Sequence, residues 1–393
     1  MSESSNVDKT RGVSESSGAD RVSGVDKTSN ANESGDVRKA SGANRLSDTQ
    51  LANAAACIKK IVDNIETVII GKREVVELVV LSLVSGGHVL IEDVPGVGKT
   101  SLVSAMARSI SGAFKRIQFT PDVMPSDVTG FSIFNQKTRE FEFRPGAVIS
   151  NIVLADEINR ASAKTQSSLL EAMEEQQVTV DGHTYRLPRP FMVLATQNPL
   201  ESFGTYPLPE AQIDRFLIKI SIGYPSFGQE VRVVDLGEKA KIALGAVADA
   251  EDVAKLIDDK EGVFVAPMLL SYLVQLVAAT RNHPDIQVGS SPRGSIALYN
   301  LARSYALYHG RSYVIPDDVK YLAPFALSHR LILTHEARLS NKTNQQVVAS
   351  ILDSVAVPVV EPAGAGANVG ANTGTKPVVG AGANTGTSAG ANK

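Results

Sequence analysis

The sequence predicts a three-layer α/β domain followed by a smaller all-helical domain, with a disordered tail at each end. From about residue 51 to Tyr224, helical stretches alternate with short apolar runs bounded by polar, Pro or Gly residues. Such runs are typical of buried parallel strands, and their alternation with helices predicts helices on both faces of a parallel sheet. After Pro225 the apolar runs stop and only helical patterns follow, two of which begin at Pro292 and Pro316.

The individual elements follow from these patterns. Helices are expected at 51–65, 72–85 and 101–109, and parallel strands at 88–91, 116–119, 152–155, 191–195 and 217–222. Two hairpins interrupt the series, at 131–134 with 140–143 and at 178–180 with 185–187, the second through an Asp181-Gly182 turn. The helical domain is expected to contain helices at 229–244, 250–258, 267–280, 292–309, 316–328 and 343–355.

The tails differ in composition from the rest of the 393-residue chain. Residues 1–49 lack Ile, Phe, Tyr and Trp, and 358–393 contain 8 Gly and 8 Ala among 36 residues. Neither segment can bury enough apolar surface to offset the entropy lost on ordering, so both are expected to be disordered. This leaves an α/β domain at 50–225 and a helical domain at 226–357.

Composition excludes several classes of protein. The net charge of −3 provides no overall basic field, so a nucleic-acid partner is not expected. The single Cys57 excludes an internal disulfide, and no apolar stretch reaches the length of a membrane span. The N-terminal residues lack the apolar region of a signal peptide, so we expect a cytoplasmic location.

The segment from Asp93 to Ser101 has the pattern of a phosphate-binding loop. It follows the expected strand 88–91 and opens a helix, so its glycines let the backbone approach a phosphate that the helix N-terminus faces. Lys99 would reach the terminal phosphates and the Thr100 hydroxyl would ligate Mg²⁺. One position departs from the usual pattern, because Asp93 replaces the first Gly. The expected nucleotide-binding residues of the loop are Pro95, Gly96, Val97, Gly98, Lys99, Thr100 and Ser101.

An acidic pair, Asp156 and Glu157, ends the expected strand 152–155, about 57 residues after Lys99. A buried parallel strand delivers such residues to the sheet edge where ligands bind. Asp156 fits a metal-binding role and Glu157 fits the orientation of an attacking water. Taken alone, the same pattern also occurs as a helix cap or a solvated turn.

With these residues in place, the sequence resembles the MoxR family of AAA+ ATPases over about residues 50–340. The resemblance implies a P-loop AAA+ domain and a helical lid. It is carried by QFTPD (118–122), PSDVTG (125–130), DEINRA (156–161), LEAMEE (170–175), ATQNP (195–199) and SPR (291–293).

The resemblance implies further site residues. Asn198 would help to place the lytic water, the alternative being an Asn-Pro turn. Arg215 would reach the γ-phosphate of a neighbouring subunit, and Arg293 would contact the phosphates from the lid. A solvated arginine is the alternative for both. Ile70 and Gly71 would border the adenine, the alternative being an ordinary helix end.

The resemblance also implies the activity. A Mg²⁺-dependent ATPase would work as a ring, a hexamer in the leading hypothesis, that remodels or activates a client, for example a von Willebrand A-domain protein. Two alternatives stay open: a nucleotide-gated binding scaffold with little turnover, and a chelatase-type motor subunit.

Overall fold

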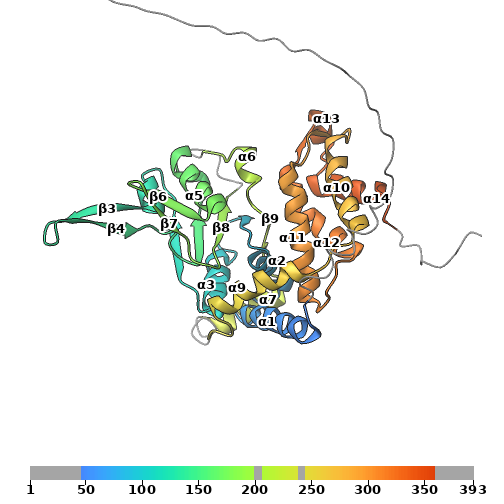
Figure 1. Cartoon of the computed structure of the whole chain (residues 1–393). Coiled ribbons are helices and arrows are strands. Elements are labelled where there is room, and N and C mark those ends of the chain that lie inside the picture. Colours follow the sequence, from blue (N-terminus) through green and yellow to red (C-terminus); the bar gives the residue numbers. More distant parts are fainter. Residues whose placement is uncertain (1–45, 199–205, 238–243, 359–393) are drawn as a thin grey trace, which may run out of the picture.

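The computed structural model describes residues 46–198, 206–237 and 244–358. Its centre is a five-stranded parallel sheet in the order β2-β5-β8-β1-β9 (Figure 1). The strands are β1 (Val89–Glu92), β2 (Phe114–Gln118), β5 (Ile152–Asp156), β8 (Met192–Gln197) and β9 (Ile218–Ile220). All five predicted strands are confirmed. Because they are parallel, the residues that follow β1, β5 and β8 meet at one edge of the sheet.

Helices cover both faces of the sheet, as the three-layer prediction requires. Alternate strand residues face opposite sides: Val89 and Ile91 pack in one hydrophobic cluster, and Leu90 packs in the other. The first cluster includes α1 (Asp48–Glu66), α2 (Arg73–Val84) and α3 (Lys99–Ser109), and the second includes α5 (Ala163–Glu175). The short elements η1 (Ile158–Arg160), α4 (Pro125–Thr129) and α6 (Glu210–Ile213) lie in the connections.

Helix α1 begins earlier than expected. The Ser47 hydroxyl accepts a hydrogen bond from the Gln50 amide, and the Gln50 side chain accepts one from the Ser47 amide. This capping box places residues 47–49 in the folded domain instead of in the predicted tail. The remaining tail residues, 1–45 and 359–393, lie outside the described residues.

The two predicted hairpins are confirmed as β3 (Gly130–Asn135) with β4 (Glu140–Pro145), and β6 (Gln177–Val180) with β7 (His183–Arg186). Asp181 and Gly182 both have positive φ angles, as a tight hairpin turn requires. The β3–β4 hairpin projects from the side of the molecule opposite the helical domain (Figure 1). Its base is joined to β7 by stacking of the Phe143 and Tyr185 rings, 3.9 Å apart.

The helical domain is confirmed, with one shortened helix and several elements that were not predicted. It contains α10 (Pro267–Arg281), α11 (Pro292–Tyr308), α12 (Pro316–Leu327), η3 (Ser328–Arg330), α13 (His335–Leu339) and α14 (Asn344–Ser354). The short helix α13 was not predicted. Nor was an antiparallel pair, β10 (Ile286–Val288) and β11 (Ile332–Leu333), whose strands are too short to show an alternating pattern.

The segment that links the two domains also departs from expectation. Helix α7 (Phe227–Leu236) ends at Gly237, which has a positive φ, whereas a helix over 229–244 was predicted. Residues 238–243 lie outside the described part of the chain. Helix α9 (Ala250–Asp259) and η2 (Lys260–Gly262) follow, and α9 packs against α1 and α2.

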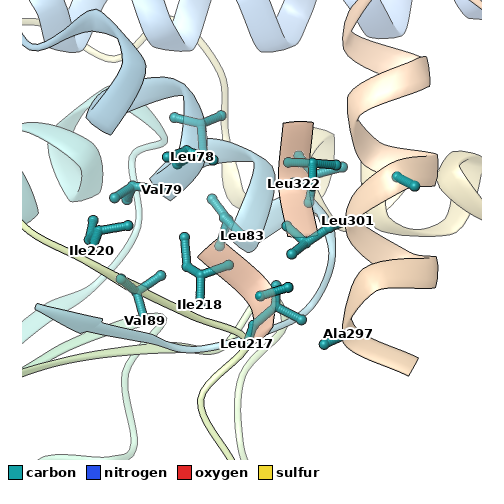
Figure 2. Close-up of a cluster of buried hydrophobic side chains, with 14 of the residues drawn as sticks. Leu78, Val79, Leu83, Val89, Leu217, Ile218, Ile220, Ala297, Leu301 and Leu322 are labelled. Carbon is teal, nitrogen blue, oxygen red and sulfur yellow. The ribbon is translucent and has the colours of Figure 1, made fainter. Parts of the chain in front are cut away.

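One hydrophobic core connects the helical domain to the sheet. Figure 2 shows Leu78 and Leu83 of α2 beside Ile218 of β9, facing Leu301 of α11 and Leu322 of α12. All five side chains are at most 1% exposed. The lid helices therefore pack directly on the β9 side of the sheet domain, and the cost of exposing this core opposes their separation.

His88, just before β1, is a buried polar side chain in this framework. Its Nδ1 accepts a hydrogen bond from the Val193 amide at 3.0 Å, and its Nε2 donates to the Met173 carbonyl at 3.1 Å. Burial lowers the pKa of His88 to about 4, and burial also lowers the pKa of His329 well below its ordinary value. Both imidazoles are therefore neutral in the folded protein near pH 7.

The described residues contain no helix that is both long and apolar enough to cross a bilayer.

We expect the free energy of unfolding to decrease as the pH falls below about 6.5, because the unfolded chain then binds protons that buried His88 and His329 do not. His88 alone should account for roughly 2 kcal/mol between pH 7.5 and pH 5. Urea denaturation of the wild type and His88→Gln at both pH values measures this. The variant should be less stable at pH 7.5 but less sensitive to pH. His183→Gln, at an exposed position, is the control, and an unchanged pH dependence in His88→Gln would contradict the assignment.

Candidate nucleotide site

The phosphate loop lies between β1 and α3, as predicted. Gly96 and Gly98 have φ angles of 88° and 94°, which favour glycine. Gly98 caps α3 and has no side chain to occupy the first amides of the helix, so these amides remain available to an anion. The Lys99 Nζ lies 2.9 Å from the Asp93 carbonyl oxygen, which holds the ammonium beside the loop.

Two adjoining cavities lie at this loop. The phosphate cavity, about 370 Å³, is lined by Pro95, Gly96, Gly98, Lys99, Thr100, Ser101, Arg116, Gln118, Asp156, Glu157 and Asn198. The base cavity, about 360 Å³, is lined by Val68, Ile69, Ile70, Lys72, Gly96, Val97, Gly98, Ser101, Ile222, Gly223, Pro225, Val233 and Gly237. They share Gly96, Gly98 and Ser101, so a single ligand can extend from the polar cavity into the more apolar one.

Gly71 does not line either cavity, although it was predicted beside the base. Its φ is 72°, and a Cβ atom there would lie 2.1 Å from the Gln229 Nε2. Gln229 in turn donates a hydrogen bond to the Gly71 carbonyl at 3.2 Å. Gly71 therefore fixes the start of α7 against the segment that contains Ile70.

The acidic strand end is held by Thr196 of β8. The Thr196 hydroxyl donates to Asp156 Oδ1 at 2.7 Å and accepts from the Glu157 amide at 2.9 Å. Glu157 has a φ of 57°, an uncommon backbone conformation for a residue with a side chain, and such outliers cluster at functional sites. Asn198, buried at the end of β8, lines the same cavity. The structure thus brings Glu157 and Asn198 together beside Lys99.

Two residues of β2 were missed by the sequence analysis. Arg116 donates two hydrogen bonds to Asp156 Oδ2, at 2.6 and 3.2 Å, and one to the Gln118 side-chain oxygen. The Gln118 amide donates to Glu157 Oε2 at 3.0 Å, and Arg160 lies 2.9 Å from the same oxygen. The Glu157 carboxylate is therefore paired. Gln118 was noted only as part of a stretch that resembles the family, without a role of its own. Arg116 has no motif or spacing that would have indicated a place in the site.

The residues at this edge fit a magnesium ion bound together with a nucleotide. The Thr100 hydroxyl and the Asp156 carboxylate are hard oxygen donors, and Mg²⁺ typically uses one or two such groups plus water and phosphate oxygens. Within the described residues no cluster of three or more acidic, His or Cys side chains forms a self-sufficient metal site. The donor set therefore suits an ion that arrives with its phosphates.

Asp93 has a structural role that the sequence did not indicate. Its Oδ2 accepts hydrogen bonds from the amides of Ile222 and Gly223, both at 2.7 Å, and from the Ser221 hydroxyl at 3.0 Å. Burial alone would raise the pKa of this carboxyl, but these hydrogen bonds and one from the Val94 amide outweigh it, so the pKa is lowered. The carboxylate ties the phosphate loop to the segment that borders the base cavity.

Arg215 and Arg293 lie elsewhere. Both line a separate cavity of about 250 Å³ that shares no residue with the phosphate cavity. Arg215 Nε lies 2.9 Å from Glu174 Oε2, and Arg293 Nη2 pairs with Glu174 Oε1. Arg293, which was expected to contact the phosphates from the lid, therefore lies on a different cavity from the phosphate loop of its own subunit. A cation in the first turn of α11 opposes the helix dipole, and Glu174, not a phosphate, is its anionic partner here.

Asp214, next to Arg215, fixes this region to the lid. Its carboxylate accepts hydrogen bonds from the Ser291 hydroxyl at 2.7 Å and from Arg330 Nε at 2.9 Å. Arg330 is buried and also donates to the Phe216 and Leu217 carbonyls. These contacts hold the segment before β9 and the start of α11 in one arrangement.

A parallel sheet with a phosphate loop, an acidic strand end and a packed helical lid defines the AAA+ class of P-loop proteins. Residues 88–218 match the sequence model of the ATPase family associated with various cellular activities (AAA), and residues 278–351 match the AAA lid domain.

Relatives extend the match along the chain. An uncharacterized protein, YeaC, of Bacillus subtilis is 56% identical over 302 residues, which are 76% of this chain and 94% of YeaC. Chaperone MoxR1 of Mycobacterium tuberculosis is 42% identical, over 79% of this chain and 85% of that protein. A crystal structure of a candidate ATPase from Cytophaga hutchinsonii is 36% identical and superposes with a TM-score of 0.74, covering 82% of this chain and 99% of that one. The chain belongs to the MoxR family of AAA+ ATPases.

We expect Asp93→Asn to lower the free energy of unfolding by about 1–3 kcal/mol, because the amide replaces one of the carboxylate oxygens that accept the surrounding hydrogen bonds. It should also weaken nucleotide binding, since the Ser221–Gly223 segment borders the base cavity. Chemical denaturation and titration with a fluorescent ATP analogue measure the two effects. Asp235→Asn, at an exposed position of α7, is the matched control. Equal stability and affinity in the two variants would show that the Asp93 contacts contribute nothing.

Proposed function

We propose that the chain binds ATP with Mg²⁺ and hydrolyses it, and that hydrolysis requires a neighbouring subunit in a ring. The observation that carries the proposal is that Glu157 and Asn198 meet beside Lys99 and Thr100 in one cavity, next to an apolar cavity large enough for a base. A phosphate-binding site without catalysis needs neither a carboxylate nor an amide at the position of the attacking water.

Different residues of the chain would bind the phosphates, the base, the metal ion and the attacking water. The amides after Gly98 and the Lys99 ammonium bind the phosphates, and Ile70 and Val97 contact the base. Mg²⁺, held through Thr100 and Asp156, would neutralise charge on the phosphate oxygens. Glu157 would accept a hydrogen bond from the attacking water, which Asn198 would help to position, while Gln118 and Arg160 contact the Oε2 atom of its carboxylate.

The positions of two arginines support the proposal that the subunits form a ring. Arg215 and Arg293 lie together on a cavity away from the phosphate loop of their own subunit. If both serve hydrolysis, they serve the nucleotide of a neighbour, and a closed ring gives each subunit one such neighbour. We propose a hexamer, following the family resemblance. An arginine supplied in trans accelerates phosphoryl transfer by several orders of magnitude.

For the biological role we propose only a general class of activity. The name of the mycobacterial relative, Chaperone MoxR1, supports remodelling or activation of client proteins. We propose the cytoplasm as the location of this activity. A von Willebrand A-domain protein is the client class that we propose first. A chelatase-type motor subunit would share this site and would differ in its client.

We expect Glu157→Gln to bind ATP within about threefold of the wild-type affinity and to lose at least about 100-fold in turnover, because the amide is a much weaker acceptor for the proton of the attacking water. Calorimetric titration and steady-state phosphate release measure the two quantities. Glu171→Gln, an exposed residue of α5, should match the wild type. Undiminished turnover in Glu157→Gln would refute the role of Glu157. Binding without turnover in the wild type would favour the nucleotide-gated scaffold.

A further inference from the structure

Glu174 is the point at which the two arginines converge. It lies in the last turn of α5, the helix that begins just after the acidic strand end. Its two carboxylate oxygens pair with different residues, Oε2 with Arg215 and Oε1 with Arg293. One carboxylate therefore holds a guanidinium of the sheet domain and a guanidinium of the lid at the same place.

The charges of Glu174 and Arg293 each lie at an electrostatically unfavourable end of a helix unless an opposite charge is nearby. Glu174 is an acid at a helix C-terminus and Arg293 is a cation in the first turn of α11, so each opposes the dipole of its own helix. Asp214, the nearest other carboxylate, is engaged by Ser291 and Arg330, and it lies 3.9 Å from Arg293 Nη1. Glu174 is therefore the main anion that balances Arg215 and Arg293.

The pairing leaves hydrogen-bonding capacity unused. Arg215 Nε lies 2.9 Å from Glu174 Oε2, yet its N–H is buried and has no acceptor in line within the described residues. The contact is thus an electrostatic pair without a well-directed hydrogen bond. A phosphate has more acceptor oxygens and more negative charge than a carboxylate, so it can satisfy both guanidinium groups more completely.

The contact is also open to an incoming ligand. The side chains of Glu174, Arg215 and Arg293 are 38%, 27% and 44% exposed, and all three line the 250 Å³ cavity. Ion pairs at such exposure are weak, so exchange of one anion for another is inexpensive. The segment that carries Arg215 is meanwhile fixed by Asp214 and Arg330, so its backbone stays in place while the anion beside the guanidinium changes.

We propose that Glu174 is a positioning residue that occupies the phosphate position of the two arginines until a neighbour's ATP displaces it. This inference rests on the proposed function, in which Arg215 and Arg293 contact the nucleotide of the adjacent subunit. Glu174 holds both arginines ready in the free subunit, and it competes with the phosphate that joins one subunit to the next. Removal of its charge strengthens nucleotide-dependent assembly.

The test compares Glu174→Gln with Glu175→Gln, which removes the same charge from the same helical turn. Turnover is measured against protein concentration at saturating ATP. Glu174→Gln should reach half-maximal specific activity at about three- to tenfold lower protein concentration than the wild type, with saturating turnover within about threefold. Glu175→Gln should match the wild type. A loss of saturating turnover comparable to that of Arg215→Ala, without a shift in concentration, would overturn the proposal, and so would behaviour identical to Glu175→Gln.

A second measurement does not depend on hydrolysis. Modification of dilute, nucleotide-free subunits with phenylglyoxal, followed by peptide mass spectrometry, reports the accessibility of each arginine. Arg215 and Arg293 should react about threefold faster or more in Glu174→Gln than in the wild type, while Arg232 on α7 stays unchanged. Equal rates would overturn the pairing. If the wild type shows no turnover, the proposed function fails, and this measurement still decides whether Glu174 occupies the arginines.

Discussion

The hydrophobic core shared by α2, β9, α11 and α12 determines how the rest of the molecule can work. Because Leu83, Ile218 and Leu301 pack in one continuous cluster, the lid lies against the β9 side of the sheet and not over the phosphate loop. The buried pairing of Arg330 with Asp214 strengthens this placement at the polar margin of the core. The lid thereby carries Arg293 to Arg215 and away from the phosphate loop of its own subunit.

This placement divides the candidate site residues into two parts. The phosphate loop, Asp156, Glu157 and Asn198 form one part at the carboxyl edge of the sheet. Arg215 and Arg293 form the other, around Glu174. Helix α5 lies between the two parts in the chain, because it begins after η1 and carries Glu174, the partner of both arginines, in its last turn.

Local patterns predicted most of the fold and half of the site. Buried parallel strands, the Asp181-Gly182 turn and the phosphate loop each have a signature in adjacent residues. The strands and the turn were confirmed, and the loop lies between β1 and α3 as predicted. The pairs Arg116–Asp156 and Gln118–Glu157 join residues about 40 positions apart, and Arg293–Glu174 joins residues 119 positions apart. No periodicity indicates such contacts, because they depend on strand order and lid placement. Asp93 was similarly noticed as a departure from the motif, but its partners at 221–223 were not predictable.

The central claim is that a complete site needs residues from two subunits, and mixing two inactive variants tests it most directly. Arg215→Ala retains Glu157, and Glu157→Gln retains Arg215. In randomly mixed rings at equal ratio, about a quarter of the interfaces combine an intact Glu157 with an intact Arg215. Phosphate release, absent in either variant alone, is expected to return in the mixture and to be greatest near equal ratio. No recovery at any ratio would contradict it.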